Sequence, residues 1–418
     1  MSIKRAGLAG GDVTSRWKRD GFYVSPYNYD HEARAGLNFP KKVTIHDVTL
    51  RDGEQQSGIV FRKGEKVRIA SALDEAGVNR IEAGLPSVSK EDTEALKEIA
   101  HLGLRAKVFA FARCMKADVD NALSVDVDGL VMEIPSSDHL IKYGYGWGES
   151  KAIDLAVEAT DYAHRHGLYV AFFTIDSTRA SFDVFWRLIS KVANQGHMDS
   201  LAVADTFGVM NPQAYSYFIS RIKKVTRKPI EIHAHNDFGL GVANTLAGLA
   251  AGGEVAHVTV NGIGERSGNT SLEELVLALK MLYGVQTDIK LDRMRSLSKL
   301  VEQLSGVRLT PQKPVVGDRL FETESGIIAG WWSRLEKLGM PLEMFPFLPE
   351  VVGHDKVHIA VGKKSGRDSI SYKARELGLK VNEGDIDRIV LTVKEEAIRK
   401  KRTLTDKEFA RIVARMVR

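Results

Sequence analysis

The chain has 418 residues, of which 44% are hydrophobic and 27% charged, a composition typical of a large folded protein. Its formal net charge is only +5, and no dense basic stripe appears, which argues against a nucleic-acid-binding protein. No apolar run approaches the roughly 20 residues that a membrane span requires, and the N-terminus lacks the apolar block of a secretory signal. The one cysteine, Cys114, excludes an internal disulfide. We therefore expect a cytoplasmic protein that acts on small molecules, without nucleic-acid or membrane partners.

Residues 1–40 are polar and basic, and they carry aromatic side chains around Pro26. This composition predicts a loosely ordered N-terminal arm. An arm that packs on a partner subunit through its tyrosines, among them Tyr27 and Tyr29, is the alternative.

From Val43 onward, short apolar segments alternate with segments of helical periodicity. The predicted strands are Val43–Val48, Arg80–Ala83, Lys107–Phe111, Gly129–Ile134, Tyr169–Thr174, Ser200–Ala204, Ile230–His235 and His257–Val260. The predicted helices are Lys63–Glu75, Lys90–Ile99, Asp118–Ser124, Ser150–His166, Ser181–Asn194, Gln213–Val225, Gly241–Ala251 and Ser271–Leu282. Eight alternations predict a closed (β/α)8 barrel over residues 41–284. An open, doubly wound parallel sheet is the alternative.

The alternation of strands and helices ends after the predicted barrel. Residues 285–345 predict a first helical subdomain, with prolines in its loops, and residues 346–418 predict a second, small and basic subdomain. The charged run Lys394–Arg402 is interpreted as the solvated face of a helix. The fold class is thus α/β, a TIM barrel followed by small, mainly helical C-terminal subdomains.

Three segments place polar side chains just past predicted strand ends, where the active sites of such barrels lie. His233 and His235 are two residues apart on one strand, so both imidazoles point the same way. Asp52 follows the first strand and Asn269 follows the last one. Two imidazoles, a carboxylate and an amide oxygen suit Mg, Mn, Zn or Co. Such a cation would polarise the keto group of a chelating 2-oxo acid, and Arg51 could donate to the same oxygen.

These residues carry a resemblance. The segment Thr49–Gln55, the His233/His235 pair and the loop Gly262–Asn269 resemble the isopropylmalate, homocitrate and citramalate synthases, with HMG-CoA lyase a more distant relative. The segment Gly362–Arg367 is similar to a motif in the subdomains that follow the synthase barrel. The resemblance implies a Claisen-type addition of an acyl-CoA, such as acetyl-CoA, to a 2-oxo acid, followed by thioester hydrolysis.

The resemblance also implies roles for individual residues. Asp52, His233 and His235 would be metal ligands, with Asn269 at or near the metal, and Arg51 would polarise the keto group. Gln55 would lie in the substrate pocket, and Thr206 would hold the carboxylate of the 2-oxo acid. An ordinary strand-end hydroxyl that bonds the next helix remains open for Thr206. A homodimer would be expected, because family barrels borrow the following subdomain from a neighbour.

Two positions depart from the synthase pattern. Ile175 stands where the synthases have a glutamate, and Ile328 stands where they have a histidine. An apolar side chain cannot move a proton, although Glu324, Asp176 or Tyr372 could substitute. Two alternatives therefore stay open: a carbon–carbon lyase that uses the same metal, and an inactive metal-binding homologue.

The remaining candidate groups are interpreted as structural. Cys114 is expected to be a small buried hydrophobe rather than a catalytic thiol. Five histidines lack paired ligand spacing and are interpreted as helix-end or structural residues: His139, His164, His166, His197 and His257. Because the sequence ends before the additional domain that senses leucine in full-length isopropylmalate synthases, we expect no leucine feedback.

Overall fold

The computed structural model describes residues 14–416, which fold as two compact units. One unit is Tyr27–Leu309, and the other combines the segment before Tyr27 with the chain from Thr310 onward. Each unit is built on its own core, and the first holds the predicted strand–helix alternation.

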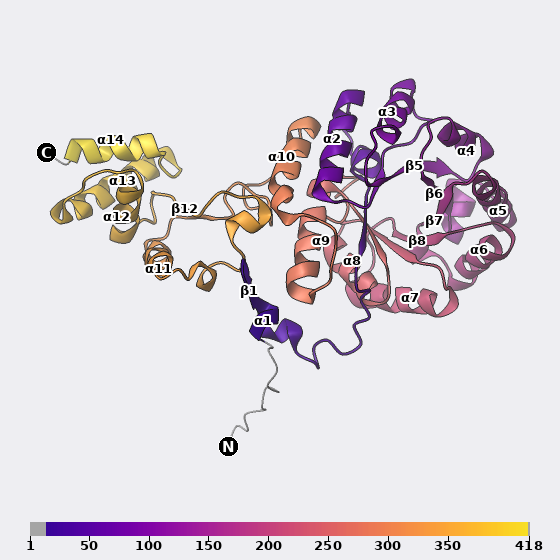
Figure 1. The fold of residues 1–418 in the computed structure, drawn as a ribbon, viewed down its shortest axis with the longest axis horizontal. Helices are drawn as coiled ribbons and strands as arrows, with labels where there is room; N and C mark the ends of the chain where they lie inside the picture. The colour runs from indigo at the N-terminus through magenta and orange to yellow at the C-terminus, as the bar shows by residue number, and fades with distance from the viewer. Residues whose placement is uncertain (1–13, 417–418) are drawn as a thin grey trace, which may run out of the picture. The chain divides into compact units, whose positions relative to one another are not determined.

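The first unit is a closed barrel of eight parallel strands (Figure 1). The strands are β3 (Thr44–Asp47), β4 (Arg80–Glu82), β5 (Lys107–Arg113), β6 (Gly129–Pro135), β7 (Tyr169–Ile175), β8 (Ser200–Asp205), β9 (Ile230–Ala234) and β10 (Val255–Val258). β10 pairs with both β9 and β3, and this closes the sheet. The predicted (β/α)8 barrel is confirmed, and the open doubly wound sheet is excluded. Most strand residues are buried because both faces of the sheet are covered, and β5, β6 and β7 are largely apolar.

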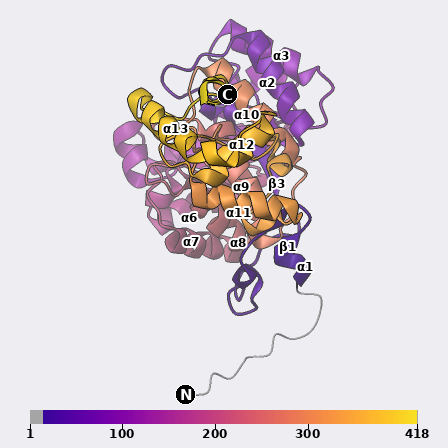
Figure 2. The ribbon, with the colours of Figure 1, turned by 90° about the vertical axis from the view of Figure 1, so that its left-hand side faces the viewer.

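Helices surround the strands, and neighbours such as α7 and α8 pack against each other (Figures 1 and 2). The helices are α2 (Lys63–Ala76), α3 (Lys90–Ala100), α4 (Lys116–Leu123), α5 (Glu149–Arg165), α6 (Phe182–Gln195), α7 (Pro212–Val225), α8 (Gly241–Ala250) and α9 (Leu272–Ala278). Two of these helices begin with a side-chain cap, since the side chains of Ser89 and Asn211 accept hydrogen bonds from the backbone N–H groups of Asp92 and Ala214.

Element boundaries differ from the prediction at two places around the last strand. β10 spans Val255–Val258, whereas the prediction placed this strand at His257–Val260. The helix expected to reach Leu282 ends as α9 at Ala278 and continues as the π-helical turn η6 (Leu279–Tyr283).

α10 (Met294–Ser305) belongs with the barrel. It packs on α2, and the backbone carbonyl of Ser298 accepts a hydrogen bond from the side chain of Asn261 at 3.0 Å. Besides η6, the short helical turns of this unit are η1 (Pro26–Tyr29, which begins in the other unit), η2 (Thr49–Gly53), η3 (Leu140–Gly144), η4 (Ser177–Arg179), η5 (Val260–Gly262) and η7 (Leu291–Arg293).

The other unit is mainly helical, as predicted for the C-terminal region. Its elements are α1 (Thr14–Trp17), β1 (Lys18–Arg19), β2 (Phe22–Tyr23), β11 (Glu322–Thr323), α11 (Gly326–Lys337), η8 (Pro341–Glu343), η9 (Pro349–Val352), β12 (His358–Ile359), α12 (Arg367–Glu376), η10 (Glu383–Asp385), α13 (Ile386–Lys400) and α14 (Asp406–Met416). A core that includes Ile370, Ile389 and Phe409 joins α12, α13 and α14.

The two compact units cut across the four segments predicted from the sequence. Residues 285–309 pack with the barrel, whereas the segment before Tyr27 packs with the C-terminal chain, where Phe22 pairs with Phe347 and Tyr23 donates its backbone N–H to Pro346. Residues 1–13, a part of the expected arm, lie outside the described residues. No helix in the described range 14–416 is both long and apolar enough to cross a membrane.

Two glycines that follow barrel helices differ in the space around them. Gly77 and Gly103 both have positive φ, but a Cβ on Gly77 would lie 2.2 Å from the carbonyl oxygen of Asp288, whereas a Cβ on Gly103 would meet nothing within 4 Å. We expect Gly103→Ala to cost about 1–2 kcal/mol of unfolding free energy, the cost of a left-handed alanine. Gly77→Ala should cost about 1–3 kcal/mol more because of the clash. Chemical denaturation of both variants measures the difference, and equal losses would contradict the packing described at Gly77.

Candidate active site

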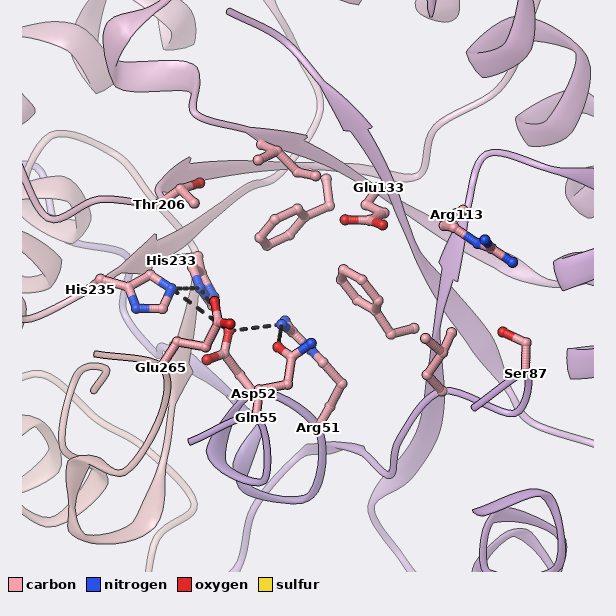
Figure 3. A pocket seen from close by; sticks show the side chains of 14 residues that line it. Arg51, Asp52, Gln55, Ser87, Arg113, Glu133, Thr206, His233, His235 and Glu265 are labelled. Atoms are coloured by element: carbon pink, nitrogen blue, oxygen red, sulfur yellow. Dashed lines mark hydrogen bonds and ion pairs between the residues drawn. The ribbon is translucent and has the colours of Figure 1, made fainter. Parts of the chain in front are cut away.

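A cavity of about 350 Å³ opens at the end of the barrel where the strands finish (Figure 3). Every strand contributes a side chain at its carboxyl end or in the loop after it. The lining residues are Arg51, Asp52, Gln55, Leu85, Ser87, Phe111, Arg113, Glu133, Phe173, Ile175, Thr206, His233, His235 and Glu265. The structure therefore brings together most of the residues that the sequence singled out.

The loop that presents Asp52 is fixed from inside the barrel. After β3 the chain forms the buried turn η2, and the carboxylate of Asp47 accepts hydrogen bonds from the backbone N–H and the hydroxyl of Thr49 at 2.9 and 3.0 Å. Burial raises the pKa of Asp47 to about 7 in spite of these two bonds. Gly53 lies against Ile263, whose side chain would have to shift if residue 53 carried a Cβ, since that Cβ would lie 3.0 Å from Cγ1 of Ile263.

Asp52 and the two predicted histidines form one buried group. Nε2 of His233 and Nε2 of His235 lie 3.5 and 3.7 Å from Oδ2 of Asp52, and 3.3 Å from each other. The three ligand atoms all lie within 4.8 Å of one another. Two imidazole nitrogens and a carboxylate oxygen that converge in this way fit a divalent cation.

The protonation states also suit a cation. Burial opposes the ionisation of Asp52, but the Arg51 guanidinium and the two imidazoles outweigh it and hold the pKa of Asp52 well below its ordinary value. Burial lowers the pKa of His233 to about 3 and also lowers that of His235. At neutral pH the group is a carboxylate beside two neutral imidazoles, which is the form that binds metals.

Asn269 lies beside Asp52, where its Nδ2 donates a hydrogen bond of 2.8 Å to Oδ1 of the carboxylate. Gly264 permits this contact, because a Cβ there would lie 2.3 Å from Nδ2 of Asn269. In this structure Asn269 orients the carboxylate of Asp52. A direct bond from Asn269 to a metal stays a prediction.

Arg51 is buried and joins two carboxylates. Its Nη1 lies 2.7 Å from Oδ2 of Asp52, and its Nε contacts Oε1 of Glu82. Its guanidinium stacks 4.1 Å from the ring centre of Phe111. Among the described residues, Nη2 of Arg51 has no hydrogen-bond partner. This buried donor is available to an oxygen atom of a ligand in the cavity.

Nδ1 of His233, the ring nitrogen that faces away from Asp52, takes part in a series of contacts that could not be predicted from the sequence. Nδ1 of His233 lies 3.3 Å from Nδ1 of His257, whose Nε2 lies 2.7 Å from Oε2 of Glu231. If Glu231 accepts a proton from Nε2 of His257, then Nδ1 of His257 is free to accept one from His233. That tautomer leaves the lone pair of His233 Nε2 facing Asp52.

His257 is therefore structural, as interpreted, but it acts on the site. The sequence shows only that Glu231, His233 and His235 share one face of an extended strand. The contact with His257 depends on the fold, in which His257 pairs in register with His46 on β3 and the two rings stack 4.4 Å apart. Glu82, Glu133, Ser87 and Arg113 were also missed, since each lies singly in a strand or loop without a motif.

Thr206 and Gln55 line the cavity, as the resemblance implies. Oγ1 of Thr206 accepts a hydrogen bond of 2.8 Å from the backbone N–H of Asp176. Its hydroxyl hydrogen is thus left to donate to a ligand. Oε1 of Gln55 lies 3.4 Å from Nη1 of Arg51.

Glu324 and Tyr372 lie in the C-terminal unit. Oε1 of Glu324 accepts a hydrogen bond of 2.9 Å from the backbone N–H of Lys364. The hydroxyl of Tyr372 accepts from Trp332 at 3.1 Å and donates to Glu336 at 2.9 Å. Catalytic roles for Glu324 and Tyr372 stay predictions.

The structure also gives the positions of Ile175 and Ile328, which depart from the synthase pattern, and of Cys114. Ile175 lines the cavity, so its apolar character is a property of the site itself, whereas Ile328 lies half-buried on α11. Cys114 is buried, and burial raises the pKa of its thiol. This agrees with the interpretation of Cys114 as a small buried hydrophobe.

Residues 42–301 match the HMGL-like family. The chain belongs to this family. Residues 333–401 match a second model, the homocitrate synthase post-HMGL domain-like family. The HMGL-like assignment covers the whole barrel and its active-site end.

Relatives in this family carry synthase names. The chain is 39% identical over 392 residues to a homocitrate synthase of Methanothermobacter thermautotrophicus, covering 94% of this chain and 97% of that one. It is 40% identical to a 2-isopropylmalate synthase of Methanocaldococcus jannaschii, covering 92% of this chain and 74% of the other. An (R)-citramalate synthase of the same organism is 39% identical, with coverages of 84% and 70%.

Solved structures agree on the fold. The HMG-CoA lyase of Bacillus subtilis superposes with a TM-score of 0.59 at 21% identity, covering 65% of this chain and 97% of that one. The HMGL-like barrel is thus supported by both sequence and structure.

Removing one proposed ligand tests the metal site. We expect Asp52→Ala and His235→Ala to abolish binding of divalent metal, because either change leaves two of the three converging ligands. Elemental analysis after dialysis measures the bound metal. His166→Ala is the matched control, since the side chain of this exposed histidine contacts the carbonyl and the ring of Tyr162, and it should retain wild-type content. Wild-type metal content in both site variants would refute the ligand assignment.

Proposed function

We propose that this chain is a divalent-metal-dependent acyltransferase, which condenses an acyl-CoA such as acetyl-CoA with a 2-oxo acid and then hydrolyses the thioester. The observation that supports it most is the convergence of Asp52, His233 and His235 beside Arg51 in one cavity. The homocitrate, isopropylmalate and citramalate synthases among its relatives support the same reaction class.

Asp52, His233 and His235 would hold the divalent cation, which could be Mg, Mn, Zn or Co. When bound, the cation supplies Lewis acidity toward a keto oxygen. The chain's own contribution is to keep the three ligands deprotonated and fixed. Arg51 and Asn269 both contact the carboxylate of Asp52, and His257 sets the tautomer of His233.

Arg51 is the electrostatic catalyst in this proposal. Its Nη2 is buried and has no partner among the described residues, so it can donate to the keto oxygen as negative charge develops there. The contacts of Arg51 with Asp52 and Glu82 fix the guanidinium before substrate arrives. Such preorganisation lowers the cost of reaching the transition state.

Thr206 and Gln55 would bind the 2-oxo acid. The hydroxyl of Thr206 has a hydrogen to donate, because its oxygen already accepts from Asp176. A substrate carboxylate can accept that hydrogen. The homodimer and the cytoplasmic location expected from the sequence stay predictions.

A thiol-release assay tests the reaction. Wild-type protein, divalent metal, acetyl-CoA and a panel of 2-oxo acids that differ in side-chain size and charge should release free CoA with at least one panel member. Omitting the 2-oxo acid is the control. No release with any panel member, together with cleavage of a hydroxyacyl-CoA, would replace the synthase by a lyase. No turnover in either direction despite bound metal would indicate an inactive homologue.

A second assay tests Thr206. We expect Thr206→Val to raise the KM for the 2-oxo acid about 10–100-fold, the effect of losing one hydrogen bond to a charged group. Thr206→Ser keeps the hydroxyl and is the matched control, with KM near the wild-type value. Initial rates at saturating acyl-CoA measure both. An unchanged KM in the valine variant would exclude a carboxylate-binding role for Thr206.

A further inference from the structure

One charged side chain that lines the cavity is left without a partner. Within residues 14–416, the carboxyl of Glu133 makes no hydrogen bond or ion pair. The other charged groups of the cavity wall are all engaged. Arg51 contacts Asp52, Arg113 binds Asp118, and Glu265 lies 3.7 Å from Arg266. Glu133 is half-buried and lines the cavity, so its unpaired carboxyl is open to a ligand bound there.

The position of Glu133 on β6 directs it into the site. It pairs in register with Phe173 on β7, and the aromatic side chains of Phe111 and Phe173 line the same cavity. Figure 3 shows the carboxyl of Glu133 pointing into the cavity, across from the side chains of Arg51 and Asp52. Ile175, on the neighbouring strand, offers no group that can move a proton. Glu133 thus supplies a carboxyl to a wall that is otherwise aromatic and aliphatic.

The surroundings of Glu133 suit proton transfer at neutral pH. Burial raises the pKa of Glu133 to about 7, although the guanidiniums of Arg51 and Arg113 act in the opposite direction. A group that takes and returns protons works best when its pKa lies near the working pH. The other titratable groups that interact with Glu133 are Glu82 on β4, Cys114 after β5, Asp118 on α4 and Tyr145 after η3.

Condensation with a thioester needs such a group. The α-carbon of an acyl-CoA becomes a nucleophile only when it loses a proton, and the proposed function assigns no residue to this step. Asp52 is unsuited to the task, because Arg51 and the two histidines hold it as a carboxylate beside the proposed cation. Glu265 lies next to Arg266 and outside the aromatic wall.

We propose that Glu133 is the general base that removes the α-proton of the acyl-CoA, an inference that rests on the proposed function. An oxygen of Glu133 takes the proton, and the electron pair of the C–H bond forms the enolate of the thioester. The enolate carbon then bonds to the keto carbon of the 2-oxo acid, whose C=O pair moves to oxygen and takes up a proton. Water later displaces CoA as the thiol, and the proton on Glu133 returns to solvent.

Glu133→Gln removes the base and keeps the shape of the side chain. We expect kcat to fall by 100-fold or more, while metal content and 2-oxo acid binding, measured by calorimetry, stay at wild-type levels. Glu133→Asp retains a carboxyl that is one methylene shorter, and it should keep more activity than the glutamine variant. Glu94→Gln, the same change on the surface of α3, is the matched control.

Two further measurements separate proton transfer from a structural role. In the wild type, kcat should rise with pH up to about 7 and then level off, because the base must be deprotonated, and Glu133→Gln should lose this rise. With acetyl-CoA that carries deuterium on its methyl group, the isotope effect on kcat should be larger in Glu133→Asp than in the wild type, since a misplaced base makes proton removal rate-limiting.

The outcomes are distinct. Wild-type kcat and pH profile in Glu133→Gln would overturn this proposal alone. A raised KM for the 2-oxo acid with unchanged kcat would also overturn it, because Glu133 would then bind the substrate side chain. Failure of the wild type to release thiol would overturn the proposed function, and this proposal with it.

Discussion

The interior of the barrel depends on ionised side chains that are buried and must therefore be paired. Arg51 joins Asp52 to Glu82, and Arg80 holds Glu231 at 2.7 Å. Burial opposes the ionisation of Glu82, yet Arg51 and His46 hold its pKa at about 2, and the pKa of Glu231 is lowered likewise by His257 and Arg80. A buried carboxylate without a counter-charge costs several kcal/mol. The network runs through the barrel interior to Arg51 and Asp52, which line the cavity, and so helps to fix the geometry of the cavity.

The carboxylates of this network outnumber its guanidiniums. Its three ionised carboxylates, Asp52, Glu82 and Glu231, face two guanidiniums, Arg51 and Arg80. His46 and His233 add no compensating charge, because burial lowers the pKa of His46 to about 4 and that of His233 to about 3. One negative charge therefore remains among these five ionised groups. A cation bound at Asp52, where two neutral imidazoles face the carboxylate, would compensate this remaining negative charge.

Much of the fold and the proposed metal cluster could be predicted from the sequence because both follow local rules. Eight strand–helix alternations predict a closed barrel, and parallel strands place their carboxyl ends at one rim, so Asp52 and His233 meet although 181 positions separate them in the chain. The last strand was predicted to run to Val260, but β10 ends at Val258 and the chain turns into η5 at Val260. The two compact units could not be predicted from the sequence, because they depend on contacts such as that of Phe22 with Phe347, which no local pattern indicates.

The contacts around the proposed metal cluster could not be predicted from the sequence, because they also depend on how distant segments meet. His257 touches His233 only because β10 closes the barrel between β9 and β3, and no spacing within either strand indicates that contact. Glu133 could not be predicted as a site residue because it is a single carboxyl within an apolar strand and belongs to no motif. Asn269 was predicted as an oxygen ligand, but the fold decides which partner its amide meets, and here that partner is Asp52.

Asp52 and Glu133 show how one cavity can give two carboxyl groups different properties. Asp52 lies beside a guanidinium and two imidazole nitrogens, so it remains ionised and serves as an anchor. Glu133 lies among phenylalanine side chains without a hydrogen-bond partner in residues 14–416, and burial raises its pKa to about 7. Paired carboxyls whose pKa values are driven apart in this way take different parts in a reaction. Because the same guanidinium, Arg51, influences both groups, a change at Arg51 would disturb the anchor and the proposed base together, and substitution at Glu133 is the cleaner way to separate them.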